Sequence, residues 1–284
     1  VITNGNDIVY YNDAAGGMGM YIFVPNGTLF AANDLKNVTV EIVEDGPVRA
    51  EIRCMVQYKD VNITREVMLY DEIDRIDFTN RLKALPATTA SVRLPTTIVN
   101  GEAYYLIPYG YIKRPLIDIT PPEFYPTTYG VHYSDEKFGV TLAVIGSHGC
   151  RVTTDGTLEF MTVRSTQTQG SVGPRVLTDF DYHQFNYTIK VSRGSKSLLE
   201  SFMLALEFNM PPVSMITSKH KGMSPKTYSL VDIESESTIV TAMKLASNGE
   251  EIILRLFNTC NESDEAIIKL PFAVDEAKVV DLLE

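Results

Sequence analysis

The chain has 284 residues, of which 44% are hydrophobic and 21% charged, a balance typical of a globular protein that can bury a sizeable core. Its formal net charge of -11 opposes binding to phosphate backbones and excludes nucleic acid as a partner. No stretch approaches the roughly 18 apolar residues of a membrane-spanning helix, so we expect no membrane partner.

Both ends of the sequence look like cuts in a longer polypeptide. The chain begins at Val1 without a methionine, and strand-like alternation still runs at Glu284. The compartment stays open: cytoplasmic for a prokaryotic protein, lysosomal or secretory for a eukaryotic one. The three cysteines, Cys54, Cys150 and Cys260, match neither a disulfide framework nor a zinc motif, and we expect buried thiols.

Period-two alternation of apolar and polar residues dominates the first half of the chain. A flexible entry at 13–17 leads into an apolar strand at 18–24. Strands at 50–58 and 61–70 flank Lys59-Asp60 and predict an antiparallel hairpin, which a strand at 75–82 extends into a meander. In the strand 50–58, one face carries Ile52, Cys54, Val56 and Tyr58.

The middle of the chain continues this pattern and adds one helical candidate. Further strands are predicted at 91–99, 103–111, 137–145, 158–163 and 181–191. A turn at Thr154-Asp155-Gly156 separates two of them, and 166–173 is expected to be a mobile polar loop. Residues 198–208 show apolar spacings of three and four, which favour a helix, with a strand as the alternative.

The last part predicts a second, smaller domain. Residues 218–226 resemble a linker, and four short strands follow at 227–232, 239–245, 251–257 and 265–270. We therefore predict an all-β protein with a large domain at 1–217, the linker, and a small β-sandwich, complete or incomplete, at 227–284.

An aromatic stretch at 103–115, AYYLIPYGYIKRP, stands out as a contact surface. Its four tyrosines suit the core and rim of a sandwich, a sugar ring, or a neighbouring domain. We interpret five residues as candidates for a domain interface: Tyr105, Tyr109, Tyr111, Lys113 and Arg114.

Self-contained catalytic patterns are absent from the sequence. The acidic cluster at 71–77 is a turn rather than two carboxylates that face each other across a cleft. Asp179, Asp181 and His183 alternate onto one side of a strand and could bind a metal or move a proton, but a surface cluster explains them as well. Arg164 and Arg175 flank the polar loop, where guanidinium groups suit sugar hydroxyls or the carboxylates of another domain.

Several segments together resemble the C-terminal β domains of family 38 glycoside hydrolases, the α-mannosidases. The similar segments, in the order of the family, are MYIFVPN (20–26), GPVRA (46–50), ITREVMLY (63–70), RIDF (75–78), YPTTY (125–129), GVTLA (139–143), DGTLEFM (155–161) with Arg164, and IILRLFN (252–258). Each segment is short, and the shared order over nearly the whole chain carries the resemblance.

The resemblance implies a large twisted super-sandwich of the galactose mutarotase type, followed by a smaller sandwich. It also implies that catalysis, by an aspartate and a zinc ion, belongs to a preceding domain that this chain lacks. We therefore assign no catalytic residue, metal ligand or cofactor to this chain. The family's basic loop, which reaches the substrate cleft, corresponds to Arg164, Ser165 and Arg175, with Ser165 where some members carry a second arginine.

Three functional hypotheses follow. The first is a non-catalytic C-terminal part of an α-mannosidase-like enzyme, whose partners are the parent catalytic domain and mannose-containing glycans. The second is a stand-alone glycan-binding module that stacks sugars on Tyr104, Tyr105, Tyr109 and Tyr111. The third is a mutarotase-like epimerase with His183 and a nearby carboxylate as acid and base.

Overall fold

The computed structural model describes residues 1–13, 23, 25–118, 124–165, 167–170, 173–176, 180–194 and 198–281, with 167–170 and 173–176 described by their backbone alone. This part of the chain is nearly all β, as predicted, with one α-helix, α1 (Leu198–Asn209), and a short 3-10 turn, η1 (Ala32–Asp34). It divides into two compact units, Val1–Lys196 with Met203–Pro211, and Ser197–Phe202 with Pro212–Glu284. The predicted boundaries at 217 and 227 stay a prediction.

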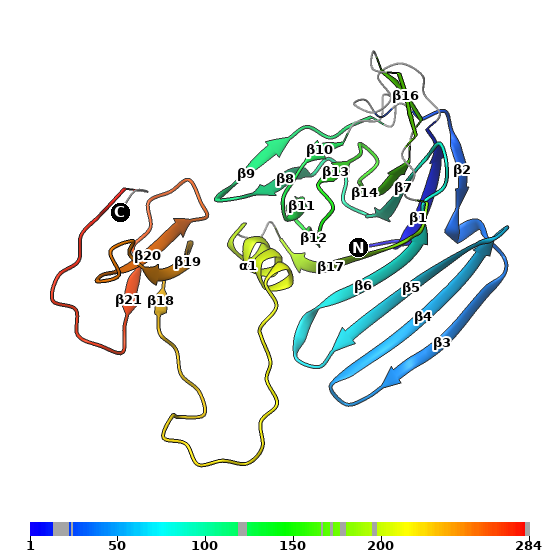
Figure 1. Cartoon of the computed structure of the whole chain (residues 1–284). Coiled ribbons are helices and arrows are strands. Elements are labelled where there is room, and N and C mark those ends of the chain that lie inside the picture. Colours follow the sequence, from blue (N-terminus) through cyan, green and yellow to red (C-terminus); the bar gives the residue numbers. More distant parts are fainter. Residues whose placement is uncertain are drawn as a thin grey trace. The chain divides into compact units, whose positions relative to one another are not determined.

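The first unit contains a nine-stranded antiparallel sheet (Figure 1). Its strands, in spatial order, are β3 (Val38–Asp45), β4 (Arg49–Tyr58), β5 (Val61–Tyr70), β6 (Ile73–Lys83), β17 (Tyr182–Arg193), β12 (Phe138–Val144), β11 (Gly130–Ser134), β8 (Glu102–Ile107) and β9 (Gly110–Arg114). The predicted meander is confirmed as β4, β5 and β6. Lys59, with φ of 54°, makes the left-handed turn between β4 and β5.

A six-stranded antiparallel sheet forms the second layer of this unit. Its strands, in spatial order, are β10 (Tyr125–Pro126), β13 (Gly149–Val152), β14 (Thr157–Ser165), β7 (Thr88–Pro95), β1 (Asp7–Asn12) and β2 (Thr28–Ala31). A separate hairpin, β15 (Gln167–Gly170) with β16 (Gly173–Val176), follows β14, so the loop predicted for 166–173 is partly a strand. The strand predicted for 18–24 lies, apart from Phe23, outside the described residues.

The two large sheets share one hydrophobic core that is rich in aromatic rings. Tyr10 and Phe160 come from the six-stranded sheet, and Tyr105, Tyr133 and Tyr187 from the nine-stranded sheet, all completely buried. The rings of Phe160 and Tyr187 meet edge to face, with centroids 4.9 Å apart. The buried hydroxyl of Tyr10 donates to the carbonyl of Lys83 at 2.7 Å, whereas that of Tyr187 has no hydrogen-bond partner among the described residues.

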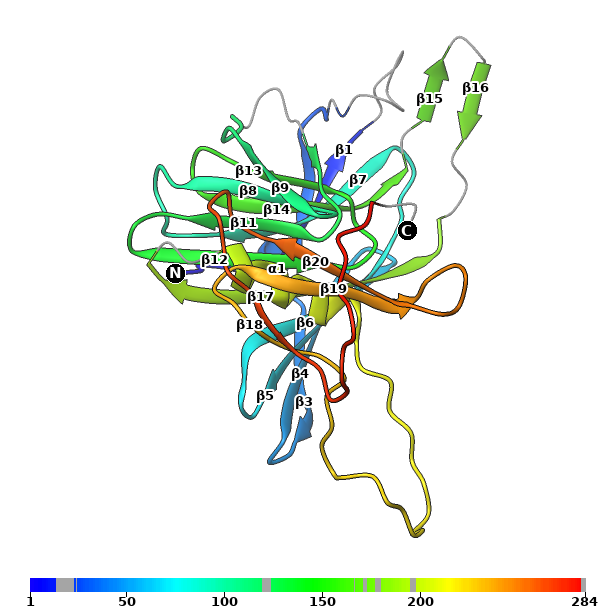
Figure 2. The ribbon, with the colours of Figure 1, turned by 90° about the vertical axis from the view of Figure 1, so that its left-hand side faces the viewer.

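One end of the nine-stranded sheet extends beyond this core. In Figures 1 and 2, β3, β4 and β5 reach away from the strands of the six-stranded sheet. Cross-strand partners on the core-facing side run in one row from Phe78 through Val67 and Ile52 to Ile42, and exposure rises along it from 7% at Phe78 to 72% at Ile42. We call the exposed part the apolar sheet face. It consists of Val38, Val40, Ile42, Ile52 and Leu69.

The second unit is small. It contains two short antiparallel pairs, β18 (Asp232–Glu234) with β21 (Ile267–Lys269) and β19 (Thr238–Leu245) with β20 (Ile252–Asn258). Phe202 of α1 packs edge to face on Phe257 of β20, with ring centroids 5.4 Å apart. The large sheets followed by a small sandwich confirm the predicted fold class.

Three local predictions were wrong. The strand predicted for 227–232 begins only at Asp232, because 227–230 are exposed and the Ser229 hydroxyl donates locally to the carbonyl of Val231. The strand 103–111 is broken by a turn at Tyr109, whose φ is 55°. Buried thiols were expected, but Cys260 is exposed, and only Cys150 is fully buried.

Candidate functional site

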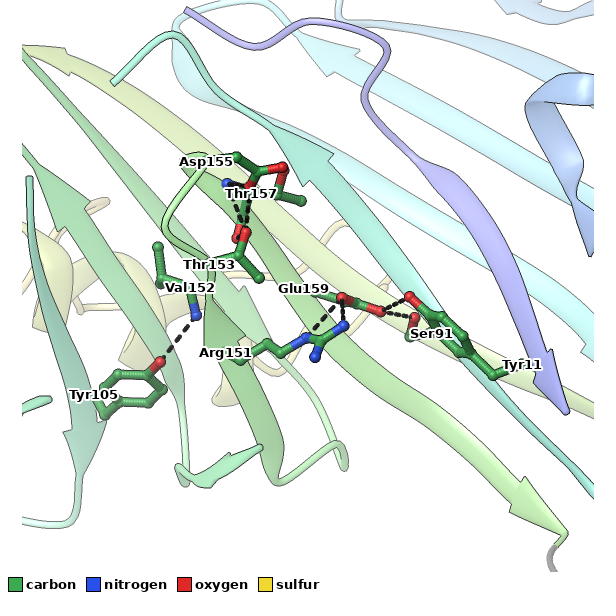
Figure 3. A network of polar contacts seen from close by, with 9 residues as sticks. All are labelled: Tyr11, Ser91, Tyr105, Arg151, Val152, Thr153, Asp155, Thr157 and Glu159. Carbon is green, nitrogen blue, oxygen red and sulfur yellow. Dashed lines mark hydrogen bonds and ion pairs between the residues drawn. The ribbon is translucent and has the colours of Figure 1, made fainter. Parts of the chain in front are cut away.

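Two charged side chains are buried on the face of the six-stranded sheet that points away from the core. Arg151 on β13 and Glu159 on β14 are direct cross-strand partners. The Arg151 Nε and Nη2 donate to Glu159 Oε2 at 2.8 and 2.6 Å, and the side chains are only 3% and 1% exposed (Figure 3). A buried charge is stable only when it is paired and hydrogen-bonded, so each residue depends on the other.

The second oxygen of the Glu159 carboxylate accepts two hydroxyl groups. Tyr11 of β1 donates to Oε1 at 2.6 Å, and Ser91 of β7 donates to the same atom (Figure 3). Burial first, and then the neighbouring Glu159 charge, raise the pKa of Tyr11 well above its ordinary value. The phenol therefore stays a hydrogen-bond donor at any physiological pH, and the carboxylate of Glu159 is held by three strands.

The β13–β14 hairpin turn is fixed by its own polar contacts. Burial alone would raise the pKa of Asp155, yet hydrogen bonds from Thr153 and Thr157 lower it below its usual value. Beside the turn, the amide of Val152 donates to the hydroxyl of Tyr105 at 3.1 Å (Figure 3). These contacts set the register that places Arg151 opposite Glu159.

A second buried ion pair lies on the same sheet at the far end of β14. Arg164 Nε donates to Asp13 Oδ2 at 2.7 Å, and the hydroxyl of Thr89 donates to the same oxygen at 2.6 Å. Asp13 is completely buried and Arg164 is 16% exposed. The guanidinium is thus anchored inside the domain and keeps a small exposed fraction.

Aromatic rings contact both arginines. The Arg151 guanidinium lies 4.8 Å from the ring centre of Phe124, and that of Arg164 lies 5.7 Å from the ring centre of Phe23. Phe23 and Phe124 meet edge to face at 5.4 Å, and Tyr11 meets Phe23 at 5.8 Å. The two ion pairs and these rings form one cluster, which we call the charged cluster.

The charged cluster is suited to holding strands and positioning a guanidinium, not to acid–base catalysis. Both of its carboxylates, Asp13 and Glu159, already accept hydrogen bonds from guanidinium groups. Retaining glycoside hydrolysis instead needs one carboxylate free to attack and another free to donate a proton. Within the described residues, no group of three or more His, Cys, Asp or Glu side chains could hold a metal ion.

The predicted cleft-loop residues have different surroundings. Arg164 is engaged with Asp13, and Ser165, next to it on β14, is buried and pairs with Thr88 of β7. Arg175 lies on β16, opposite Thr168 of β15, and its side chain is outside the described part. The role of these residues at a cleft stays a prediction.

The predicted interface residues lie on the β8–β9 hairpin at the edge of the nine-stranded sheet. The interface prediction for Tyr105 is corrected. This side chain is completely buried, because its side of β8 faces the core, and it offers no surface to another domain. Tyr109 is exposed at the turn, and Tyr111 packs edge to face on Tyr104 at 5.6 Å. Lys113 forms an ion pair with Glu102.

Arg114, the last interface candidate, lies over an aromatic ring. Its guanidinium is 4.9 Å from the ring centre of Tyr125. Elsewhere in the sheet, His183 on β17 lies beside Phe185, with ring centroids 6.3 Å apart, and Asp181 caps the amide of Tyr182. Asp179 is outside the described residues, so the acid–base hypothesis for His183 stays untested.

Sequence reasoning missed the charged cluster, although one signal was present. The predicted turn at 154–156 folds its flanking strands so that Arg151 faces Glu159 three residues from each end of the turn. Opposite charges at facing positions of a hairpin indicate a pair. Nothing local indicates that the pair is buried, nor that Tyr11 and Ser91 complete it.

The fold is that of an all-β protein with a buried charged cluster, and comparison with protein families identifies its family. The model of the glycosyl hydrolases family 38 C-terminal domain matches residues 1–171, more than half of the chain. The family 38 C-terminal beta sandwich domain matches residues 237–284. The chain therefore belongs to glycosyl hydrolase family 38, as the resemblance predicted, and represents its C-terminal domains.

Two solved structures share the fold over 94% of this chain. One is a protein in glycosyl hydrolase family 38 from Enterococcus faecalis, with 15% identity and a TM-score of 0.81. The other is an alpha-mannosidase from Enterococcus faecalis V583, with 16% identity and the same TM-score. The chain spans only 36% and 34% of their respective lengths.

No curated protein sequence matches the chain. Its described residues include no helix that is long and apolar enough to cross a membrane.

Proposed function

We propose that this chain is the non-catalytic C-terminal part of an α-mannosidase-like glycoside hydrolase. The observation that carries the proposal is the match of both family 38 C-terminal domains, in their order, along a chain that spans about a third of the length of a structurally similar α-mannosidase. The substrates of the parent enzyme are then α-mannosides in mannose-containing glycans. This chain contributes packing and positioning to their hydrolysis.

The catalytic domain of the parent is the proposed packing partner. The apolar sheet face supports this, because Ile42, Val40 and Leu69 are 72%, 63% and 51% exposed on a face that is continuous with the core. Contiguous exposed apolar residues of this kind mark interaction surfaces in soluble proteins. We expect a second contact with the catalytic domain at the β8–β9 hairpin, where Tyr109 is exposed and Lys113 forms an ion pair with Glu102. These side chains resemble the polar rim of a protein interface.

The end of β14 is the part proposed to reach the substrate cleft. Arg164 is anchored by Asp13, so its partly exposed guanidinium has a defined position, and the β15–β16 hairpin with Arg175 follows directly. A preorganised guanidinium hydrogen-bonds sugar hydroxyls with little loss of side-chain entropy. Asp13 and Thr89 act as positioning residues for it.

We expect zinc in the proposed catalytic domain of the parent enzyme and assign no zinc ligand to this chain. The described residues offer no cluster of three metal-ligating side chains, and both carboxylates of the charged cluster are used by arginines. No step of the reaction is therefore assigned to a metal held here.

The test compares two proteins, this chain alone and the polypeptide that its gene encodes when extended upstream. Hydrolysis of p-nitrophenyl α-mannoside is measured with and without added zinc. We expect turnover by the extended polypeptide, and none by the chain alone. Turnover by the chain alone at a comparable rate would refute the proposal, as would an inactive extended polypeptide that is folded and zinc-loaded.

A further inference from the structure

A broad polar groove lies on the nine-stranded sheet, on the opposite side from the apolar sheet face. Its volume is about 800 Å³, within the usual range for small-molecule sites. Neighbouring strands supply its floor, because Thr39, Met55, Thr64 and Arg81 are successive cross-strand partners on β3, β4, β5 and β6. A rigid sheet thus presents the lining side chains in a fixed row.

Two cations line this groove, and no acidic side chain does. The guanidinium of Arg81 lies 5.2 Å from the ring centre of Tyr182, which orients it, and Lys36 lies on the rim before β3. Within the described part of the chain, neither cation forms an ion pair.

The acidic groups of the adjacent row are already committed. Glu41 and Glu66 accept hydrogen bonds from the same guanidinium, that of Arg53, at 2.8 and 2.7 Å. Arg53 thereby pairs with both carboxylates, and within the described residues neither forms an ion pair with Arg81. The Arg81 guanidinium keeps its donors for a ligand.

Val38, Met55 and Val56 also line the groove, and the remaining side chains both donate and accept hydrogen bonds. Asn37, Gln57 and Asn62 provide amides, and Thr39 and Thr64 provide hydroxyls. Tyr182 also lines the groove, and its hydroxyl accepts a hydrogen bond from the backbone amide of Asn62 at 3.3 Å. Such a lining matches the vicinal hydroxyls of a sugar better than the alternating side chains of a peptide.

We propose that this groove binds a saccharide that carries an anionic group, with Arg81 and Lys36 on the carboxylate, sulfate or phosphate and the amides on the sugar hydroxyls. A guanidinium forms paired, charge-assisted hydrogen bonds with each of these anions. Because the site faces away from the core and uses none of the cleft-loop residues, the proposal does not depend on the function proposed above. It adds a ligand site that the domain carries by itself.

The test is isothermal titration calorimetry at low ionic strength with six probes. Three are anionic saccharides: mannose 6-phosphate, mannose 6-sulfate and methyl glucuronoside. The others are methyl α-mannoside, inorganic phosphate and a hexaglutamate peptide. We expect at least one anionic saccharide to bind at millimolar concentration or below, and to bind about tenfold or more tightly than the neutral sugar, the free anion and the peptide.

Matched variants assign the binding to the groove. Arg81→Gln should weaken it about tenfold, whereas Arg193→Gln, which removes the same charge from an exposed residue at the end of β17, should leave it unchanged. Thermal unfolding establishes that both variants are folded, and Lys36→Gln on the exposed rim replaces Arg81→Gln if that variant is not.

Four outcomes would overturn the proposal. One is no binding of any anionic saccharide, and another is equal binding of the neutral sugar. The third is equal binding of free phosphate or hexaglutamate, which would indicate a plain anion site or a peptide site. The last is binding that survives the groove variant unchanged.

Discussion

The charged cluster and the apolar sheet face depart from the usual distribution of side chains in opposite directions. In the charged cluster, Arg151, Glu159 and Asp13 are almost fully buried. On the apolar sheet face, Ile42 and Val40 are mostly exposed. Both regions lie in the same unit, on different sheets. Neither the composition nor a low stability of the whole unit therefore explains why one region buries charges and the other exposes apolar side chains.

The difference teaches what each region depends on. The buried charges are paired within the described chain, by cross-strand contacts and hydroxyl donors, although Arg151 Nη1 is buried there without a hydrogen-bond partner. The exposed apolar residues are not covered by any part of the described chain. Burying them would release about 25 cal/mol per Å² of covered surface. The first region therefore governs the stability of the domain, and the second governs what it binds.

The largest expected effect is at Glu159. Glu159→Ala leaves the Arg151 guanidinium buried without its partner, and we expect the free energy of unfolding to fall by about 3–5 kcal/mol, measured by urea denaturation. The double variant Arg151→Met with Glu159→Leu removes both charges and should recover most of this loss. A cost below about 1 kcal/mol for the single variant would contradict the importance of the pair.

A smaller loss is expected at the edge of the same cluster. Tyr11→Phe removes the hydroxyl that donates to the buried carboxylate of Glu159, which should cost about 1.5–3 kcal/mol. Tyr228→Phe is the matched control, because Tyr228 is exposed, and should stay within about 0.5 kcal/mol of the parent chain. Equal effects of the two changes would show that the Tyr11 hydroxyl contributes nothing.

The pH dependence separates the two regions further. The folded-state pKa of Tyr11 is raised by burial and by Glu159, so its contribution is fully present below the unfolded value of about 10 and is lost as the pH rises above it. Urea denaturation between neutral pH and about pH 11 should show this decline, shared with the other buried tyrosines, and a shallower one in Tyr11→Phe. Parallel pH profiles would contradict the assignment. Substitutions on the apolar sheet face should not change the slope.

The smallest effect on stability is expected on the apolar sheet face. Ile42→Ser should change the free energy of unfolding of the isolated chain by no more than about 0.5 kcal/mol, while Ile63→Ala, on the same sheet side but buried, should cost about 2–5 kcal/mol. Fluorescence of a hydrophobic dye should fall in Ile42→Ser, because dye-accessible apolar surface is removed. If Ile42→Ser destabilises the chain as much as Ile63→Ala, this face is part of the core.

Much of the fold was predictable because strand periodicity is local. The β4–β5 hairpin, β12, β14, β17 and helix α1 were all predicted to within a few residues. The predictions failed where a turn or a side-chain contact overrode the alternation, as at Tyr109 and Ser229. The candidate site was harder to predict from the sequence. Arg164 was singled out, but its partner Asp13 lies some 150 residues away in the sequence.

The sequence by itself determined the all-β class, most of the strands and, through the order of short motifs, the family. The turn at 154–156 also sets the local register in which Arg151 faces Glu159, although the sequence analysis did not single out this pair. Only the tertiary structure decided which side chains are buried. Tyr105 enters the core and Ile42 stays in solvent although both alternate as core residues do, because burial depends on whether a second sheet covers that part of the strand.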